Sequence, residues 1–166
     1  MLCARLALHL SIPSGIASLT DFEYSICFLS KQTEREYQSM DGVAQVIVGY
    51  TGGQKADPTY ENIMDATEAV LIEYDPAVIS YETILSEWSK QHHPFMKQSG
   101  QYRSAIFVKN AEEQLVAQTI IKELGESRGQ KVYADVEEAG AFYRAEEYHQ
   151  DFLNKQRSSR SFNYMV

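Results

Sequence analysis

The sequence predicts a single α+β domain in which helices flank a mixed β-sheet. Three observations lead to this fold class. Several segments are rich in Val, Ile and Tyr, two long amphipathic segments lie between them, and the composition is that of an ordinary soluble protein, with 44% apolar and 23% charged residues. A chain of 166 residues is long enough to bury one sizeable core.

Five segments are expected to be strands. The first is the alternating run of Phe22, Tyr24 and Ile26 that ends at Cys27. The other strand-like segments are residues 42–50, 67–75, 102–109 and 131–138. Five strands are sufficient for a mixed sheet.

Two segments are expected to be amphipathic helices that pack on this sheet. Residues 80–92 carry Ile84, Leu85 and Trp88 at helical spacing, and Trp88 is expected in the core. Residues 110–127 begin with Asn110, a good N-cap. Shorter helices are expected at residues 30–42 and 144–156. Residues 49–62, GYTGGQKADPTYEN, form a loop that lacks the spacing of a phosphate-binding motif, so its glycines are expected to permit a tight reversal.

The charge of the chain argues against two kinds of partner. The formal net charge is −8 and the isoelectric point is near 5.0. No cluster of Lys and Arg is present that could neutralise nucleic-acid phosphates. We therefore expect neither a nucleic-acid partner nor an electrostatically held membrane surface.

The cysteines indicate a reducing compartment, cytoplasmic or organellar. Cys3 and Cys27 are too few for a disulfide framework, and no Cys/His spacing suggests a metal site. The apolar run at the beginning of the chain is broken by His9 and Pro13, so it is too short to span a bilayer. A remnant of an organelle-targeting segment is the alternative to a mobile N-terminal segment.

Two residues are candidates for chemistry. Cys27 stands where an apolar strand gives way to polar residues, and it is either a nucleophile or a small buried hydrophobe at a strand end. Glu68 opens a strand otherwise made of Ala, Val, Leu and Ile. A carboxyl group buried in apolar surroundings has a raised pKa and can donate a proton near neutrality, whereas a glutamate at a strand end can equally face water.

Five sequence blocks occur in a distinctive order: GVAQVIVGYTGG, DPTYENI, TEAVLIEYDPAVISYE, GQYRSAIF and AGAFYRAEEYHQDFL. In this order they resemble the methionine sulfoxide reductase A family. The resemblance covers residues 22–156, and it leaves residues 1–21 as an N-terminal segment and residues 157–166 as a C-terminal tail. It implies a two-layer α/β sandwich with a ferredoxin-like arrangement.

The resemblance also implies a reaction at Cys27. The family has a Gly-Cys-Phe-Trp motif where this sequence has ICFL, so Cys27 and Phe28 match and Leu29 replaces the tryptophan. By this resemblance, Cys27 attacks the sulfur of a sulfoxide as a thiolate and is left as a sulfenic acid. Phe28 and Leu29 would hold the methyl group of the substrate.

Three further residues complete the site that the resemblance implies. Glu68 would donate a proton to the sulfoxide oxygen, and Tyr60 and Tyr102 would hydrogen-bond that oxygen. His149 lies in a matching block, where it could orient neighbours or simply pack.

The expected function is therefore thiol-dependent reduction of methionine-S-sulfoxide, free or in proteins, to methionine. The alternative is a non-catalytic or repurposed relative that binds a methyl-sulfur compound or another small ligand in the same pocket. No bound cofactor is expected, and the reductant would be thioredoxin, glutaredoxin or a small thiol. Cys3 is a candidate resolving cysteine, because roughly two dozen residues of extended chain can span well over ~30 Å. We expect a monomer.

Overall fold

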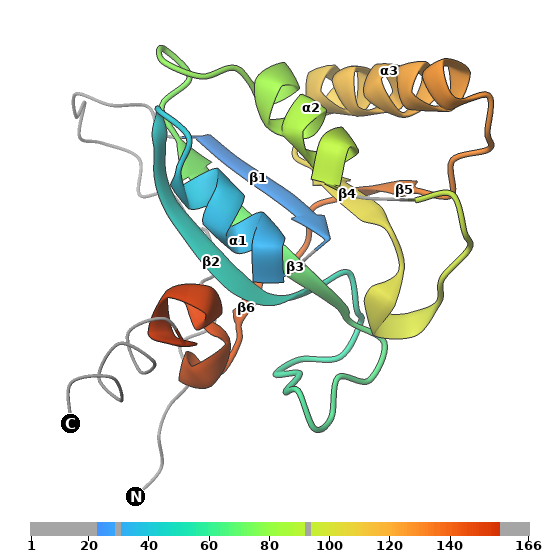
Figure 1. The fold of residues 1–166 in the computed structure, drawn as a ribbon. Coiled ribbons are helices and arrows are strands. Elements are labelled where there is room, and N and C mark those ends of the chain that lie inside the picture. Colours follow the sequence, from blue (N-terminus) through green and yellow to red (C-terminus); the bar gives the residue numbers. More distant parts are fainter. Residues whose placement is uncertain (1–22, 29–30, 92–93, 157–166) are drawn as a thin grey trace, which may run out of the picture.

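The computed structural model describes residues 23–28, 31–91 and 94–156, which form a six-stranded sheet with flanking helices (Figure 1). The elements follow one another in the order β1 (Glu23–Phe28), α1 (Lys31–Gln38), β2 (Val43–Thr51), β3 (Thr67–Tyr74), α2 (Tyr81–Gln91), the short 3₁₀ helix η1 (Gly100–Tyr102), β4 (Ala105–Val108), α3 (Ala111–Arg128), β5 (Asp135–Glu138), β6 (Tyr143–Arg144) and the short 3₁₀ helix η2 (Glu147–His149).

The sheet is mixed, as the sequence predicts, and its strand order is β5-β4-β1-β3-β2-β6. The pair formed by β4 and β5 is parallel, and the other pairs are antiparallel. A parallel pair needs a long crossover connection, which α3 supplies. Because β1 lies antiparallel between β3 and β4, its C-terminal end lies beside the beginnings of both neighbours.

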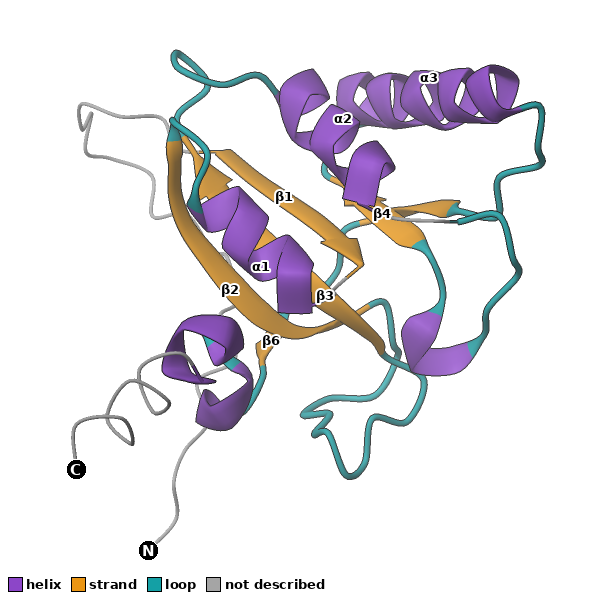
Figure 2. Cartoon of the chain, viewed as in Figure 1, coloured by secondary structure: helices purple, strands orange, loops and turns teal. Residues whose placement is uncertain are grey.

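The three α-helices pack on one face of the sheet (Figure 2). Tyr37 of α1, Trp88 of α2 and Leu124 of α3 are buried in one cluster with strand residues that include Val70 and Ile106. The other face buries a smaller cluster, to which the loop before β6 contributes Phe142. The result is the predicted two-layer arrangement, and Trp88 is a core residue at 1% exposure.

Local signals in the sequence set the ends of α3. The Asn110 side chain accepts a hydrogen bond of 2.9 Å from the backbone N–H of Glu113, so it caps the first turn. Gly129 adopts a left-handed conformation with φ 61° and ends the helix. Within the described segments, none of the helices combines the length and the apolar character that a membrane crossing needs.

Several predicted elements differ in the structure. The strand expected at residues 102–109 begins only at Ala105, because η1 precedes it. The strand expected at residues 131–138 begins only at Asp135, and the helix expected at residues 30–42 ends at Gln38. The helix expected at residues 144–156 is replaced in its first half by β6 and η2. There the Gln150 side chain accepts from the backbone N–H of Val48 (3.0 Å) and donates to its carbonyl (2.9 Å). These bonds to β2 favour a segment that lies along the sheet over a regular helix.

Candidate functional site

The backbone register places Cys27 near Glu68. Both residues lie at the end of the sheet where β1 ends and β3 begins, and Figure 1 shows these two strands side by side. Cys27 pairs with Val70 of β3, and Phe28 pairs with Ala69. Glu68 directly precedes Ala69 in β3 and therefore lies nearer this end of the sheet. The strand spacing of ~4.8 Å and a rise of ~3.4 Å per residue put the backbones of Cys27 and Glu68 about 8 Å apart. Leu29 and Cys3 lie outside the described residues.

Glu68 has a tyrosine as its direct neighbour across the sheet. It pairs with Tyr50 of β2, whose side chain is 1% exposed. The Oε1 atom of Glu68 is itself buried. Burial raises the pKa of the Tyr50 hydroxyl, and its hydrogen bond to Glu146 and the charges of Glu146 and Glu68 raise that pKa further. Tyr50 is therefore a neutral hydrogen-bond donor beside a carboxyl group.

Glu146, between β6 and η2, connects Tyr50 to Tyr60. The Tyr50 hydroxyl donates to Oε2 of Glu146 (2.8 Å), and the backbone N–H of Tyr60 donates to Oε1 (3.1 Å). The Tyr60 ring is 45% exposed and lies 4.6 Å from the ring of His149, centroid to centroid. Tyr60 thus has a fixed backbone and a ring that remains accessible to a ligand. His149 contacts the rings of Tyr60 and Tyr148, so it packs against the very loop that carries Tyr60.

Tyr102 is held near Glu68 through their sequence neighbours. Tyr102 ends η1, which packs against β3, and its side chain is 48% exposed. The next residue, Arg103, donates from Nε to the hydroxyl of Thr67 (2.7 Å), and Thr67 directly precedes Glu68. Arg103 therefore fixes η1 to the first residue of β3.

Arg103 also connects this end of the sheet to β5. Its guanidinium donates two hydrogen bonds to Glu137, the one from Nη2 at 2.8 Å, and lies 5.6 Å from the ring centroid of Phe107. Gly52 has φ 73°, and a Cβ atom there would lie 2.7 Å from both Nη2 of Arg103 and the Phe107 ring. The Gly52 position in GYTGG thus needs glycine for its conformation and for the close approach of Arg103.

The sequence motifs did not single out Glu146 or Arg103. Glu146 lies in AGAFYRAEEYHQDFL, and Arg103 lies in GQYRSAIF, so both blocks contain the signal. Their roles depend on contacts with residues 67, 137, 50 and 60, which are distant in the sequence.

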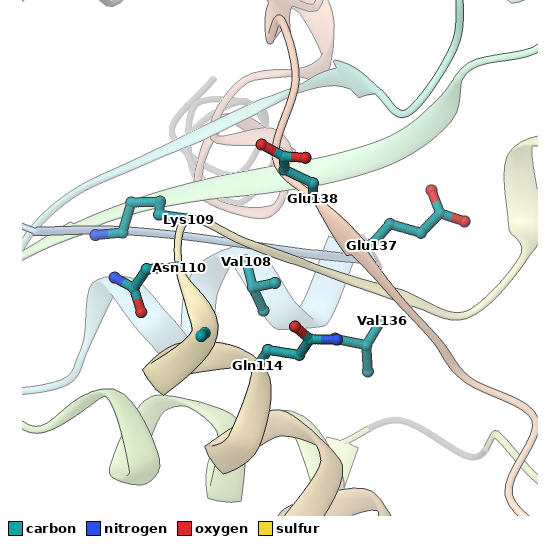
Figure 3. Close-up of a pocket in the computed structure, with 8 residues that line it drawn as sticks. Val108, Lys109, Asn110, Gln114, Val136, Glu137 and Glu138 are labelled. Atoms are coloured by element: carbon teal, nitrogen blue, oxygen red, sulfur yellow. The ribbon is translucent and has the colours of Figure 1, made fainter.

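A cavity of about 320 Å³ lies at the opposite end of β4, next to the first residues of α3 (Figure 3). Figure 3 shows Lys109, Glu137 and Glu138 pointing in different directions around it, whereas Gln114 reaches toward Val136. Because the charged groups diverge, this cavity presents no convergent chemistry. Among the residues that the structure describes, no group of three or more His, Cys, Asp or Glu could hold a metal ion.

The end of the sheet around Glu68 thus combines a carboxyl group, accessible tyrosines and the end of the strand that carries Cys27. A thiol beside a proton donor can support nucleophilic attack with proton transfer to a leaving or reduced oxygen. Its hydrogen-bond donors come from three separate segments, which two charged residues, Glu146 and Arg103, hold in place.

Known proteins share this architecture. Residues 25–166 match the family described as "Peptide methionine sulfoxide reductase". The chain is 38% identical over 144 residues to peptide methionine sulfoxide reductase MsrA of Bacillus licheniformis, which covers 80% of this chain and 79% of that protein. It is 36% identical over 139 residues to peptide methionine sulfoxide reductase A1 of Arabidopsis thaliana, which covers 78% of this chain and 68% of that protein. The crystal structure of Mxr1 from Saccharomyces cerevisiae in reduced form matches with a TM-score of 0.68 and 25% identity, over 81% of this chain and 85% of that chain.

Proposed function

Because the chain belongs to the peptide methionine sulfoxide reductase family and reduces methionine-S-sulfoxide with a thiol as reductant, we propose that Cys27 and Glu68 carry out the reaction. The observation that supports this pair most directly is the register of β1 on β3. In this register Cys27 pairs with Val70, and Glu68 lies two residues before Val70, nearer the end of the sheet. A nucleophile and an acid on adjacent strands can both reach one sulfoxide group.

In the proposed first step, the Cys27 thiolate attacks the sulfoxide sulfur while Glu68 donates its proton to the sulfoxide oxygen. The sulfur–oxygen bond of the substrate and the transient bond between the two sulfur atoms then break, and the oxygen passes to Cys27 as a hydroxyl group. Methionine is released with its sulfur reduced by two electrons, and Cys27 is oxidised by two electrons to a sulfenic acid. The buried position of Oε1 in Glu68 favours the neutral acid that this step needs.

Tyr60 and Tyr102 are proposed to hold the sulfoxide oxygen, and Phe28 and Leu29 to hold the methyl group. The two tyrosine side chains are about half exposed, so their hydroxyls remain accessible to a substrate. Their backbones are fixed by Glu146 and, through Arg103, by Thr67. Such fixed donors lower the cost of organising the transition state.

Recycling is proposed to use an external thiol such as thioredoxin, glutaredoxin or a small thiol. The first thiolate displaces water from the Cys27 sulfenic acid and forms a mixed disulfide, and a second thiol then releases Cys27. Cys3 is the candidate for an internal thiol that attacks the sulfenic acid in place of the first external thiol and forms a disulfide with Cys27.

The test compares Cys27→Ser, Glu68→Gln and the wild type in the dithiothreitol-dependent reduction of the S and R epimers of a blocked methionine sulfoxide. The wild type should reduce only the S epimer, Cys27→Ser should be inactive, and Glu68→Gln should lose about 10²-fold to 10⁴-fold in kcat, the usual contribution of a general acid. Dimedone should label Cys27 after one equivalent of substrate.

Glu73→Gln is the matched control, since Glu73 is a partly exposed glutamate near the far end of the same strand. Its kcat should equal that of the wild type. Turnover by Cys27→Ser would overturn the nucleophile assignment, and a wild-type kcat in Glu68→Gln would overturn the acid assignment.

A further inference from the structure

A second cavity lies at the same end of the sheet as the proposed reaction site. Its volume is about 300 Å³, and its walls come from the segments that precede β4 and β5. Arg103, which directly follows Tyr102, is part of the wall. The cavity therefore begins one residue from a side chain proposed to bind the sulfoxide oxygen.

The sheet register gives the distance from Cys27 to this cavity. Cys27 pairs with Ile106 of β4, and Ile106 pairs with Val136 of β5. Two strand spacings of ~4.8 Å place the backbones of Cys27 and Val136 about 10 Å apart. Asp135, the neighbour of Val136, lines the cavity. An extended peptide advances ~3.3 Å per residue, so a side chain two or three residues from the methionine sulfoxide could reach the cavity.

Arg103 does not supply free positive charge to the cavity. Its guanidinium lies against Glu137 through two hydrogen bonds and forms an ion pair of 3.4 Å with Asp135. These two carboxylates raise the pKa of Arg103 and more than balance its single positive charge. The available charge must come from the other cations in the wall.

Lys97 and Lys131 are those cations, and both are exposed at the cavity. Neither forms an ion pair with any residue in the segments that the structure describes. The Nζ atom of Lys131 lies 4.9 Å from the ring centroid of Tyr133, which also lines the cavity and restricts where the ammonium group can lie. Lys131 lies beside an aromatic ring and Lys97 lines the same cavity, so the two lysines form a local positive site on a chain whose net charge is −8.

We propose that the cavity lined by Lys97, Lys131 and Tyr133 is a subsite for an acidic side chain of a peptide substrate, two or three residues from the methionine sulfoxide. This inference rests on the proposed reaction site at Cys27. A glutamate or aspartate of the substrate places its carboxylate beside two ammonium groups, whereas a lysine is repelled by them. The enzyme therefore selects among oxidised peptides by charge near the methionine.

The test uses short peptides with one methionine-S-sulfoxide and either glutamate or lysine two or three residues before or after it. The measured quantity is the ratio of kcat/KM for the glutamate peptide to kcat/KM for the matching lysine peptide. For at least one position, the wild type should favour glutamate about fivefold to tenfold at low salt, as expected for two ion pairs with exposed lysines. Lys97→Glu combined with Lys131→Glu should abolish or invert this preference.

Lys90→Glu combined with Lys122→Glu is the control for net charge, because it changes the charge as much as the first double variant does. Lys90 and Lys122 are exposed and do not line the cavity. This control should keep the preference of the wild type. A blocked methionine sulfoxide, which has no flanking side chains, should be reduced equally by all three proteins, so failure of the reaction itself is distinguished from failure of the subsite. An equal glutamate-to-lysine ratio in the wild type and the Lys97→Glu, Lys131→Glu variant at every position would overturn the proposal.

Discussion

Glu146 is a single residue that positions two tyrosines from distant parts of the chain. Each of its carboxylate oxygens accepts one hydrogen bond, from the Tyr50 hydroxyl and from the Tyr60 backbone N–H. A hydrogen bond to a charged acceptor is stronger than one between neutral groups. Glu146 therefore fixes Tyr60 without contacting the proposed substrate position itself.

Glu146→Ala should raise KM for a methyl sulfoxide more than it lowers kcat. Loss of the Tyr60 anchor should weaken substrate binding by about 1 kcal/mol, or about fivefold in KM, whereas the proposed nucleophile and acid are unchanged. Steady-state kinetics at several substrate concentrations separates the two constants.

The neighbouring Glu147 provides the control for this variant. Its side chain is 72% exposed and pairs with Arg144 and Lys155 on the surface. Glu147→Ala should leave KM unchanged, and Glu146→Gln, which retains an acceptor oxygen, should recover part of the loss. A fall in kcat alone in Glu146→Ala would contradict the positioning role.

Most residues of the proposed site, but not Glu146, could be predicted from the sequence. Tyr60, Glu68 and Tyr102 stand in sequence blocks, and Cys27 in the motif ICFL, for which the family resemblance implies a chemical role that stays a prediction. Glu146 could not be assigned in this way, because its partners lie 96 and 86 residues away and only the folded chain brings them together.

Among the elements, β2 and β3 are the best predicted and β6 is the least. β3 is buried along most of its length, so its apolar composition indicates a central strand. β6 has two residues, and its pairing with Gly49 and Tyr50 is a long-range contact that leaves no periodic pattern. Tertiary packing decides such short elements.

The turn after β2 depends on Gly52, and Gly52→Ala should destabilise the protein by about 1–3 kcal/mol. The substitution combines a positive φ with a Cβ atom 2.7 Å from Arg103 and Phe107. Urea unfolding followed by circular dichroism would measure the change in the free energy of unfolding.

Gly140→Ala is the matched control, since a Cβ at Gly140 would meet no described atom within 4 Å. Its free energy of unfolding should change by less than about 0.5 kcal/mol. Equal stability of the two variants would show that the loop adapts and that the close approach of Arg103 is not required.

At the level of the whole molecule, Glu34 connects α1 to the C-terminal segment. Its side chain is 3% exposed and accepts hydrogen bonds from the backbone N–H groups of Asp151 (2.5 Å) and Phe152 (3.4 Å). Burial raises the pKa of Glu34, and the two backbone hydrogen bonds only partly oppose this effect.

A raised pKa means that the folded state holds the Glu34 proton more tightly than the unfolded state. The contribution of Glu34 to stability is therefore fully present below its ordinary pKa of 4.5 and is lost as pH rises through the raised value. Relative to Glu34→Gln, the wild type should become less stable as pH rises from 4.5 toward neutrality, as measured by urea unfolding across that range.

Glu36→Gln serves as the control on the same helix, because Glu36 is exposed. The difference between its stability and that of the wild type should not vary with pH in the same way. A stability difference between Glu34→Gln and the wild type that stays constant with pH would contradict the assignment.

The acidic strand β5 has a consequence for association between copies of the chain. Among the described strands, β5 lies at one edge of the sheet, and three of its four residues, in the sequence DVEE, are carboxylates. A strand from a second copy added along this edge would bring carboxylates opposite one another at about 5 Å, where like charges repel. Near the isoelectric point of about 5.0 the whole chain loses its net repulsion. Storage at neutral pH should therefore protect the protein from edge-to-edge aggregation.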